Sequence, residues 1–268
     1  THVLRGEEHL PNTLRQVLIY QAFGFDLPRF GHFSLILAED KSKLSKRHGA
    51  SSVEELRSTG YLPGAVVNYL ALLGWSHPEE KEVLSRDELF SSFTLDRVSK
   101  SASVYDREKL KWMNGQYVRA TDVADLFSVA DPFFPDFIKS TYDESDRVKI
   151  LGLLHQKIET LAELDEKSGP FRSPPVYDDE ALEVLSTPEA KAVLKALADA
   201  VDASTEEFTG ELFKSLVKQA GKETGQKGKA LFFPVRAALT GTVHGPDLAG
   251  IAELKGKVEV TDVLDQSS

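Results

Sequence analysis

The sequence predicts a mostly helical protein in which a short α/β segment precedes a long run of helices. Three observations support this fold class. Within residues 1–50 a β-rich run, a helical repeat and a second apolar run follow one another. From residue 51 onward, apolar residues recur at helical spacing behind helix-start signals, and strand signals are few. The 268 residues, 41% of them hydrophobic, are enough for two or three packed domains.

A strand at residues 2–4, a polar turn at 5–9 and a helix that ends at Gly24 open the chain. Asn12 is the expected N-cap of this helix, because an Asn side chain accepts hydrogen bonds from first-turn amides. Gly24 is suited to the left-handed conformation that closes a helix. The apolar run 33–38 is the expected second strand.

The ends of these two strands carry the charged side chains of the segment. Ligands of open α/β sheets bind outside the carboxyl ends of the strands. Arg5 and Glu8 follow the first strand, and a basic loop follows the second. We therefore expect these groups to face one crevice.

The basic loop covers residues 41–49 and reads Lys-Ser-Lys-Leu-Ser-Lys-Arg-His-Gly. Its cations cannot be buried without paired carboxylates, so the loop is expected to be exposed. A solvated charge run on the surface is one explanation of such a stretch. The preceding strand, the small Ser45 and the terminal Gly49 favour a loop that approaches phosphate groups.

Residues 51–118 are expected to form a compact helical module. Helix-start signals occur at Ser52, Pro63, Ser85 and Asp106. The helix capped by Asp106 is expected to stop at Asn114-Gly115.

Residues 119–268 also read as helices. The expected helices cover residues 122–129, 145–164, 188–201, 205–220 and 231–240, with a last one from Pro246 to about Gly256 before a polar tail. A break near 168–176 or 202–206 would divide this region into two subdomains. The stretch 218–229 is its most basic patch.

Composition excludes several classes of site. The chain has no cysteine, which removes disulfides, cysteine-built zinc sites and thiol nucleophiles, and its seven histidines lack metal-ligand spacing, so no protein-bound metal is predicted. No apolar run reaches the roughly 18 residues of a membrane span, and no signal or transit peptide is visible. Net charge is -10, and residues 119–268 hold 17 basic and 27 acidic side chains. A nucleic acid would therefore have to bind at local basic patches.

Eight short motifs occur along the whole chain. They are Arg5-Gly6-Glu7-Glu8-His9, Pro28-Arg29-Phe30, Lys43-Leu44-Ser45-Lys46-Arg47, Gly60-Tyr61-Leu62-Pro63, Asn68-Tyr69-Leu70, Leu72-Leu73-Gly74-Trp75, Lys111-Trp112-Met113-Asn114-Gly115 and Arg236-Ala237-Ala238-Leu239-Thr240-Gly241. Each motif is weak alone. Together, in this order, they resemble bacterial-type glutamyl-tRNA synthetases, which are class I aminoacyl-tRNA synthetases.

The resemblance implies three domains. Residues 1–50 would be the C-terminal end of a class I Rossmann-like catalytic domain, with the second class I signature at 43–47. Residues 51–118 would be a helical domain that contacts the tRNA stem, and residues 119–268 an all-helical anticodon-binding region.

The first class I signature, H-x-G-H or H-x-G-N, does not occur in these residues. We therefore expect the chain to be the C-terminal portion of such an enzyme and to be inactive alone. The alternative is a natural derivative that acts as a non-catalytic tRNA-binding or structural subunit. The complete lysine-loop pattern favours the enzyme, because a scaffold has no chemical reason to keep it.

The implied reaction is ATP-dependent activation of glutamate to glutamyl-adenylate, followed by transfer to tRNA(Glu). Lys43, Ser45 and Lys46 are the candidate catalytic residues, because pyrophosphate gains charge as it leaves. Arg5 suits the carboxylate of the glutamate substrate and Glu8 the ribose of ATP. An incidental salt bridge from Arg5 to an acidic neighbour is the alternative role of Arg5.

Candidate tRNA contacts are the basic residues Lys157, Lys222, Lys227, Lys229 and Arg236. The implied partners are tRNA(Glu), glutamate and ATP with Mg²⁺, and a monomer without membrane contact is expected. A bacterial protein would act in the cytoplasm and a eukaryotic one in a chloroplast or mitochondrion. Whether tRNA(Gln) is also charged stays open, because base choice depends on contacts to exposed base edges.

Overall fold

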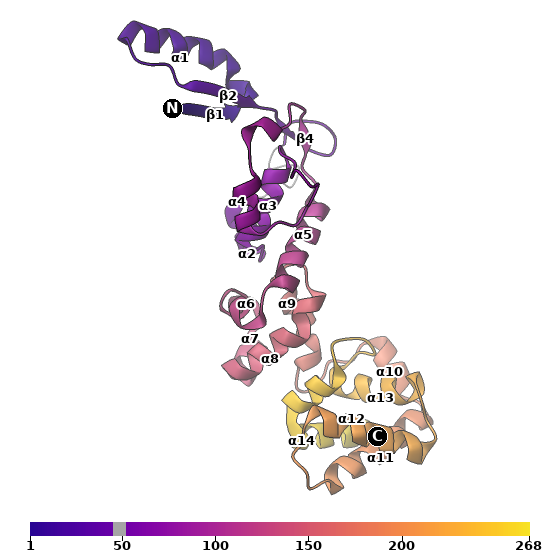
Figure 1. Cartoon of the computed structure of the whole chain (residues 1–268). Coiled ribbons are helices and arrows are strands. Elements are labelled where there is room, and N and C mark those ends of the chain that lie inside the picture. Colours follow the sequence, from indigo (N-terminus) through magenta and orange to yellow (C-terminus); the bar gives the residue numbers. More distant parts are fainter. Residues whose placement is uncertain (45–51) are drawn as a thin grey trace. The chain divides into compact units, whose positions relative to one another are not determined.

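The computed structural model describes residues 1–44 and 52–268 (Figure 1). It divides into two compact units, Thr1–Ala120 and Thr121–Ser268, which we describe separately. The described residues are mostly helical, which confirms the predicted fold class. Ser45 and Lys46 lie outside the described residues.

The first unit opens with a strand-helix-strand crossover. Strand β1 (His2–Gly6) pairs in parallel with β2 (Arg29–Phe33), and α1 (Leu10–Phe23) connects them. Gly24 closes α1 with φ 68°, as predicted. The predicted N-cap Asn12 is wrong, because α1 starts at Leu10 and carries its proline in the first turn, where a proline needs no amide partner.

The predicted strand at 33–38 is two strands with different partners. β2 ends at Phe33, and β3 (Ile36–Leu37) pairs in parallel with β4 (Ser103–Val104). Between them, Ser34 Oγ donates to Lys100 O at 2.7 Å. The chain thus leaves the β1–β2 pair and joins a strand from a segment more than 60 residues later, a partner that local pattern could not identify.

The helical part of the first unit contains α2 (Val53–Ser58), α3 (Pro63–Leu72), α4 (Arg86–Ser92) and α5 (Arg107–Ala120). Its core includes Leu56, Tyr69, Leu84, Leu110 and Met113, all buried. The capping box at Ser85 and Glu88 is complete, which confirms that prediction.

The predicted stop of α5 at Asn114-Gly115 is wrong, since the helix continues to Ala120. Asn114 is fully buried, and its Oδ1 accepts a hydrogen bond from Leu62 N at 2.7 Å. Because the side-chain amide of Asn114 is hydrogen-bonded to another segment, it is not available to cap the end of its own helix. A tertiary contact therefore overrides the local stop signal.

The second unit consists of nine α-helices in residues 121–268, all of which are described. They are α6 (Val123–Ala130), α7 (Asp136–Thr141), α8 (Glu144–Leu154), α9 (Glu163–Lys167), α10 (Asp179–Leu185), α11 (Pro188–Ala203), α12 (Gly210–Thr224), α13 (Lys229–Thr240) and α14 (Leu248–Ser267). Helices α11 to α14 enclose a core that includes Leu194, Leu197, Phe213, Val235 and Leu239.

Two helix predictions in this unit are wrong. The expected helix 145–164 ends at Leu154, and Ile158 is buried with an extended backbone (φ -116°, ψ 148°). The expected polar tail is helical, because Gly256 kinks α14 with φ 75° and the helix then continues to Ser267. The part of α14 after Gly256 buries Val260 and Leu264. This burial stabilises as a helix a segment whose composition had suggested a polar tail.

Candidate functional site

Arg5 is held near the end of β1 by two neutral oxygens of α1. Its Nη2 donates to Thr13 Oγ1 at 2.7 Å and to Gln16 Oε1 at 2.8 Å. Its Nε is buried and has no hydrogen-bond partner in the described structure. Within residues 1–44 and 52–268, Arg5 forms no ion pair with Glu7 or Glu8. The guanidinium is therefore fixed in position but not neutralised by a carboxylate there.

Glu8 and Lys43 meet at the surface, although they are 35 residues apart. Lys43 Nζ lies 3.5 Å from Glu8 Oε1, and both side chains are exposed. The pKa of the Glu8 carboxyl lies below its ordinary value, first because it accepts a backbone hydrogen bond and then because of the charge of Lys43. The end of the β1 turn and the start of the basic loop thus lie side by side.

A tight turn between Ala38 and Lys43 places the lysine. Ala38 N donates to Ser42 O at 2.8 Å, Lys41 N donates to Ala38 O at 2.9 Å, and Lys41 has the unusual φ of 63°. Leu37 and Lys43 then form an isolated antiparallel bridge. The two other residues predicted to act in this loop, Ser45 and Lys46, lie outside the described residues.

Two hollows flank this end of the first unit. One, of about 320 Å³, lies at the carboxyl ends of β1 and β2 and is lined by Glu7, His32 and Lys100 among others. The predicted residues Arg5, Glu8 and Lys43 do not line it. The structure therefore brings Glu8 and Lys43 together but turns Arg5 toward α1.

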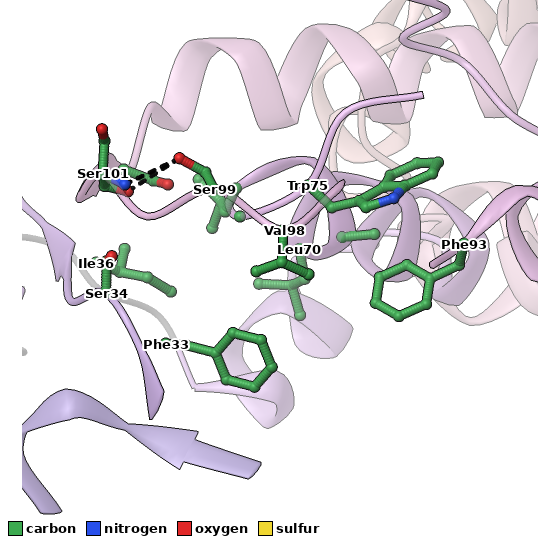
Figure 2. A pocket seen from close by; sticks show the side chains of 13 residues that line it. Phe33, Ser34, Ile36, Leu70, Trp75, Phe93, Val98, Ser99 and Ser101 are labelled. Carbon is green, nitrogen blue, oxygen red and sulfur yellow. Dashed lines mark hydrogen bonds between the residues drawn. The ribbon is translucent and has the colours of Figure 1, made fainter. Parts of the chain in front are cut away.

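The second hollow, of about 330 Å³, has apolar walls and no charged lining side chain (Figure 2). Figure 2 shows Phe33 across the cavity from Trp75 and Phe93, whose ring centres are 5.5 Å apart. Trp75 Nε1 is buried without a hydrogen-bond partner in the described structure. Lacking charge, this cavity is unsuited to phosphate or to an amino acid.

In the second unit, Lys157 and Arg236 hold one loop, residues 241–247. Lys157 Nζ donates to Gly245 O at 2.8 Å, and Arg236 Nη1 donates to Pro246 O at 2.7 Å. Arg236 is half-buried, and this desolvation lowers the pKa of its guanidinium. Two residues predicted to contact tRNA are therefore also the residues that position this loop.

The other three predicted cations, Lys222, Lys227 and Lys229, are exposed at the end of α12 and the start of α13. Lys229 Nζ lies 5.4 Å from the centre of the Phe233 ring. Phe233 in turn meets His244 of the held loop edge-on, with ring centres 5.9 Å apart.

Phe233 and His244 were missed by sequence reasoning as functional candidates. They are 11 residues apart on different elements, so no motif spacing joins them. The usable signal was an aromatic residue close to several cations, which is a composition typical of sites that stack unpaired bases.

No group of three His, Cys, Asp or Glu side chains arranged to hold a metal ion occurs in the described part of the chain. No helix among the residues that the structure describes is long and apolar enough to cross a membrane.

Two family models together match nearly the whole chain. Residues 1–112 match the model described as tRNA synthetases class I (E and Q), catalytic domain, and residues 112–267 match an anticodon binding domain. The two models meet within α5.

Similar proteins include the glutamate-tRNA ligase of Carboxydothermus hydrogenoformans, which is 42% identical over 97% of this chain and 55% of its own length. Glutamate-tRNA ligase 1 of Fervidobacterium nodosum is 44% identical over 98% of this chain and 54% of its own length. A crystal structure of a glutamate tRNA ligase from Elizabethkingia meningosepticum in complex with its amino acid superimposes on all of this chain and on 56% of that protein. The TM-score is 0.86 and the identity 30%. The chain spans about half the length of the curated relatives it matches, in agreement with the expected C-terminal portion.

Proposed function

The chain belongs to the class I tRNA synthetases of the glutamate and glutamine (E and Q) group, and we propose that it serves, within the complete enzyme, in the ligation of glutamate to tRNA(Glu). The observation that carries this proposal is the contact between Glu8 and Lys43. It joins the turn after β1 to the start of the lysine loop, at the strand ends where α/β enzymes bind ligands.

The proposed chemistry needs cations that can move toward the phosphates of ATP and away from them again. As the bond to the α-phosphate of ATP breaks, the leaving pyrophosphate gains charge, and cations at that point stabilise the transition state. We assign this role to Lys43 and Lys46, with Ser45 assisting. Lys43 is well suited, because its exposed pair with Glu8 is weak enough to be exchanged for phosphate.

Arg5 is proposed to bind the carboxylate of the glutamate substrate. Two neutral oxygens orient its guanidinium without using up its charge, which supports the assignment. Glu8 is proposed to accept from the ATP ribose. Mg²⁺ would arrive with ATP, since it is usually bound by phosphates, waters and one or two carboxylates.

The helical parts are proposed to bind tRNA. We assign stem contact to residues 51–118 and anticodon contact to 119–268, where Lys157, Lys222, Lys227, Lys229 and Arg236 are the candidate contacts. The relatives named above are bacterial, and for a bacterial source we propose a monomer that acts in the cytoplasm.

The test uses the full-length enzyme with Lys46→Ala. Loss of one transition-state donor costs about 2.7 to 4 kcal/mol, so ATP-pyrophosphate exchange with glutamate should fall roughly 100-fold to 1000-fold. Affinity for tRNA should stay near wild type, because the residue is assigned to the adenylate step alone.

The matched control is Lys41→Gln, which removes an exposed cation from the same segment and should leave exchange unchanged. Equal loss of exchange and tRNA affinity in Lys46→Ala, or loss of neither, contradicts the assignment. Absence of glutamate-dependent exchange in the wild-type full-length protein, even with tRNA present, would favour the non-catalytic tRNA-binding alternative.

A further inference from the structure

The uncharged hollow beside Trp75 in the first unit has the size of a ligand site (Figure 2). Its walls come from three segments, residues 33–36, 70–75 and 93–103, and we call it the Trp75 hollow. Its volume of about 330 Å³ lies within the range of small-molecule sites, which is about 300 to 1,000 Å³. Such sites combine mostly apolar walls with a few placed polar groups. The polar groups of the walls therefore indicate what the hollow would bind.

The side chain of Trp75 brings a buried hydrogen-bond donor to the hollow. Trp75 is 4% exposed, and its Nε1 has no hydrogen-bond partner among the described residues. In Figure 2 the ring nitrogen lies on the edge of the indole that faces Phe93 and the hollow. Buried donors are nearly always satisfied, because an unmade hydrogen bond leaves the full desolvation cost of the group. The Nε1–H thus marks a place for an acceptor that the described residues do not supply.

Two serine hydroxyls of the walls are already engaged. Ser34 Oγ donates to Lys100 O at 2.7 Å, and Ser99 Oγ donates to Ser101 O at 3.3 Å. Their hydrogens serve the backbone of the walls, so they are not available as donors to a ligand.

Aromatic rings stand on opposite sides of the hollow. Figure 2 shows Phe33 across the hollow from Trp75 and Phe93. Leu70 and Val98 lie between them in this view. Flat rings favour stacked or edge-to-face contact with another aromatic ring. A buried water molecule needs about two to four polar partners, which these apolar side chains do not offer. An acceptor carried by an aromatic molecule therefore matches both the donor and the walls.

Backbone contacts hold the wall around Trp75 in place. Ser99 N donates to Gly74 O at 2.7 Å, and Trp75 and Val98 form an isolated antiparallel bridge. The Trp75 ring also meets His77 edge-on, with ring centres 6.0 Å apart. A site whose walls are already ordered loses little conformational entropy when a ligand binds.

The hollow also touches the strand that leads to the lysine loop. Ile36 lines the hollow, and Ile36 O accepts a hydrogen bond from Leu44 N at 3.3 Å. The next residue, Leu37, forms the bridge with Lys43. A molecule in the hollow would therefore lie against the strand that positions Lys43.

We propose that the Trp75 hollow binds a small, flat, neutral molecule with one hydrogen-bond acceptor, an aromatic nitrogen or a carbonyl oxygen, directed at Trp75 Nε1. No charged side chain is among the described residues that line the hollow, so a charged ligand would lose its hydration without compensation. Further polar atoms on the ligand would lie against apolar side chains at a similar cost. The inference goes beyond the proposed function and does not depend on it, since binding alone tests it.

The test uses the full-length protein and two probes of nearly equal shape, quinoline and naphthalene. Both are flat and uncharged at neutral pH, but only quinoline has an acceptor nitrogen. Dissociation constants are measured by ligand-observed NMR titration. Both probes should bind in the micromolar to millimolar range, because a ligand of so few atoms has a limited binding energy.

Trp75→Phe removes the donor and keeps an aromatic ring in the wall. The net contribution of a neutral hydrogen bond corresponds to roughly 2-fold to 12-fold in affinity. Quinoline should lose about this factor more than naphthalene does. Because both probes meet the same altered wall, their comparison isolates the donor from changes in packing.

Gly74→Leu should fill the hollow. Gly74 lines it, and a Cβ there would meet no atom within 4 Å, so the fold has room for the side chain. Both probes should lose most of their affinity. Gly152→Leu is the matched control, because Gly152 is exposed in α8 and a Cβ there also meets no atom within 4 Å. Its affinity for both probes should equal that of the wild type.

The inference is overturned if neither probe binds the wild type, or if Gly74→Leu, shown to be folded by thermal unfolding, binds both probes as the wild type does. An equal loss in Gly152→Leu would mean that the probes bind elsewhere, and it also overturns the inference. If Trp75→Phe weakens both probes by the same factor, the donor is not used and the assigned acceptor is wrong. Where Gly74→Leu does not fold, the comparison of the two probes on Trp75→Phe decides.

Discussion

Replacing Arg236 with methionine should weaken tRNA binding through the loop 241–247. The Arg236 Nη1 hydrogen bond to Pro246 O, at 2.7 Å, is charge-assisted and half-buried, and Pro246 itself is buried. Hydrogen bonds to charged groups contribute about 1.5 to 3 kcal/mol. If the loop must be held to bind RNA, affinity should fall roughly 10-fold to 150-fold, at about 1.4 kcal/mol per tenfold.

Lys157→Met is a second variant of the same loop with which the affinity loss of Arg236→Met can be compared. Its bond to Gly245 O is exposed, so Lys157→Met should cost about 0.5 to 1.5 kcal/mol, or roughly 2-fold to 12-fold in affinity. The double variant should lose less than the sum, because both side chains hold the same short loop.

The assay is anisotropy titration of a glutamate tRNA transcript with the full-length protein, alongside ATP-pyrophosphate exchange at saturating tRNA. Amide hydrogen exchange of residues 241–247 should rise in Arg236→Met. Lys195→Met is the matched control, because it removes an exposed lysine that pairs with Asp199 and has no assigned role. Binding of Arg236→Met within about twofold of wild type, or a parallel fall in pyrophosphate exchange, would refute the reasoning.

The remaining predictions concern stability. Gly241→Ala should lower the free energy of unfolding by more than 1 kcal/mol, because φ is +78° and a Cβ there would overlap Val176 O, whereas Gly152→Ala in α8 has open space and should stabilise by about 0.5 to 1 kcal/mol. Urea titration of both variants checks this, and equal effects would contradict it. Burial raises the pKa of Tyr69 to about 12, while its hydroxyl donates to Asp106 O at 2.8 Å. The neutral phenol is thus favoured in the folded state, so stability should be full below about pH 10 and fall as the pH rises toward 12. Tyr69→Phe should flatten this fall, and an unchanged pH profile in that variant would exclude the assignment.

Local chemistry was sufficient wherever a residue acts on its own backbone neighbours. Ser85 caps α4 through Glu88 as predicted, and Gly24 closes α1 with a left-handed backbone. In both cases the interacting groups are within a few residues of one another. The spacing of these residues in the sequence is therefore enough to predict their geometry.

The errors occur where a distant segment supplies the partner. Asn114 looked like a helix stop, but its amide is engaged by Leu62, and the expected strand at 33–38 divides because β3 pairs with β4. The expected helix 145–164 ends early, and Ile158 reaches the core from an extended backbone. Hydrophobic spacing identified the buried side chains here but not the backbone that buries them.

For the candidate site, too, some features could be predicted from the sequence and others only from the structure. Sequence alone selected Arg5, Glu8 and Lys43 by residue type and by their place after strands, and their roles stay predictions. The tertiary structure decided that Glu8 meets Lys43 and that Arg5 turns to Thr13 and Gln16.

For this protein the order of residues determined the helical class, the helix ends set by local caps, and the family through motifs in register. Only the tertiary structure decided which strands pair and that Arg236 and Lys157 hold one loop. The physical reason is the separation along the chain between the interacting residues. Caps and turns are satisfied within a few residues, whereas pairing and neutralisation depend on partners that the chain brings close only when it folds.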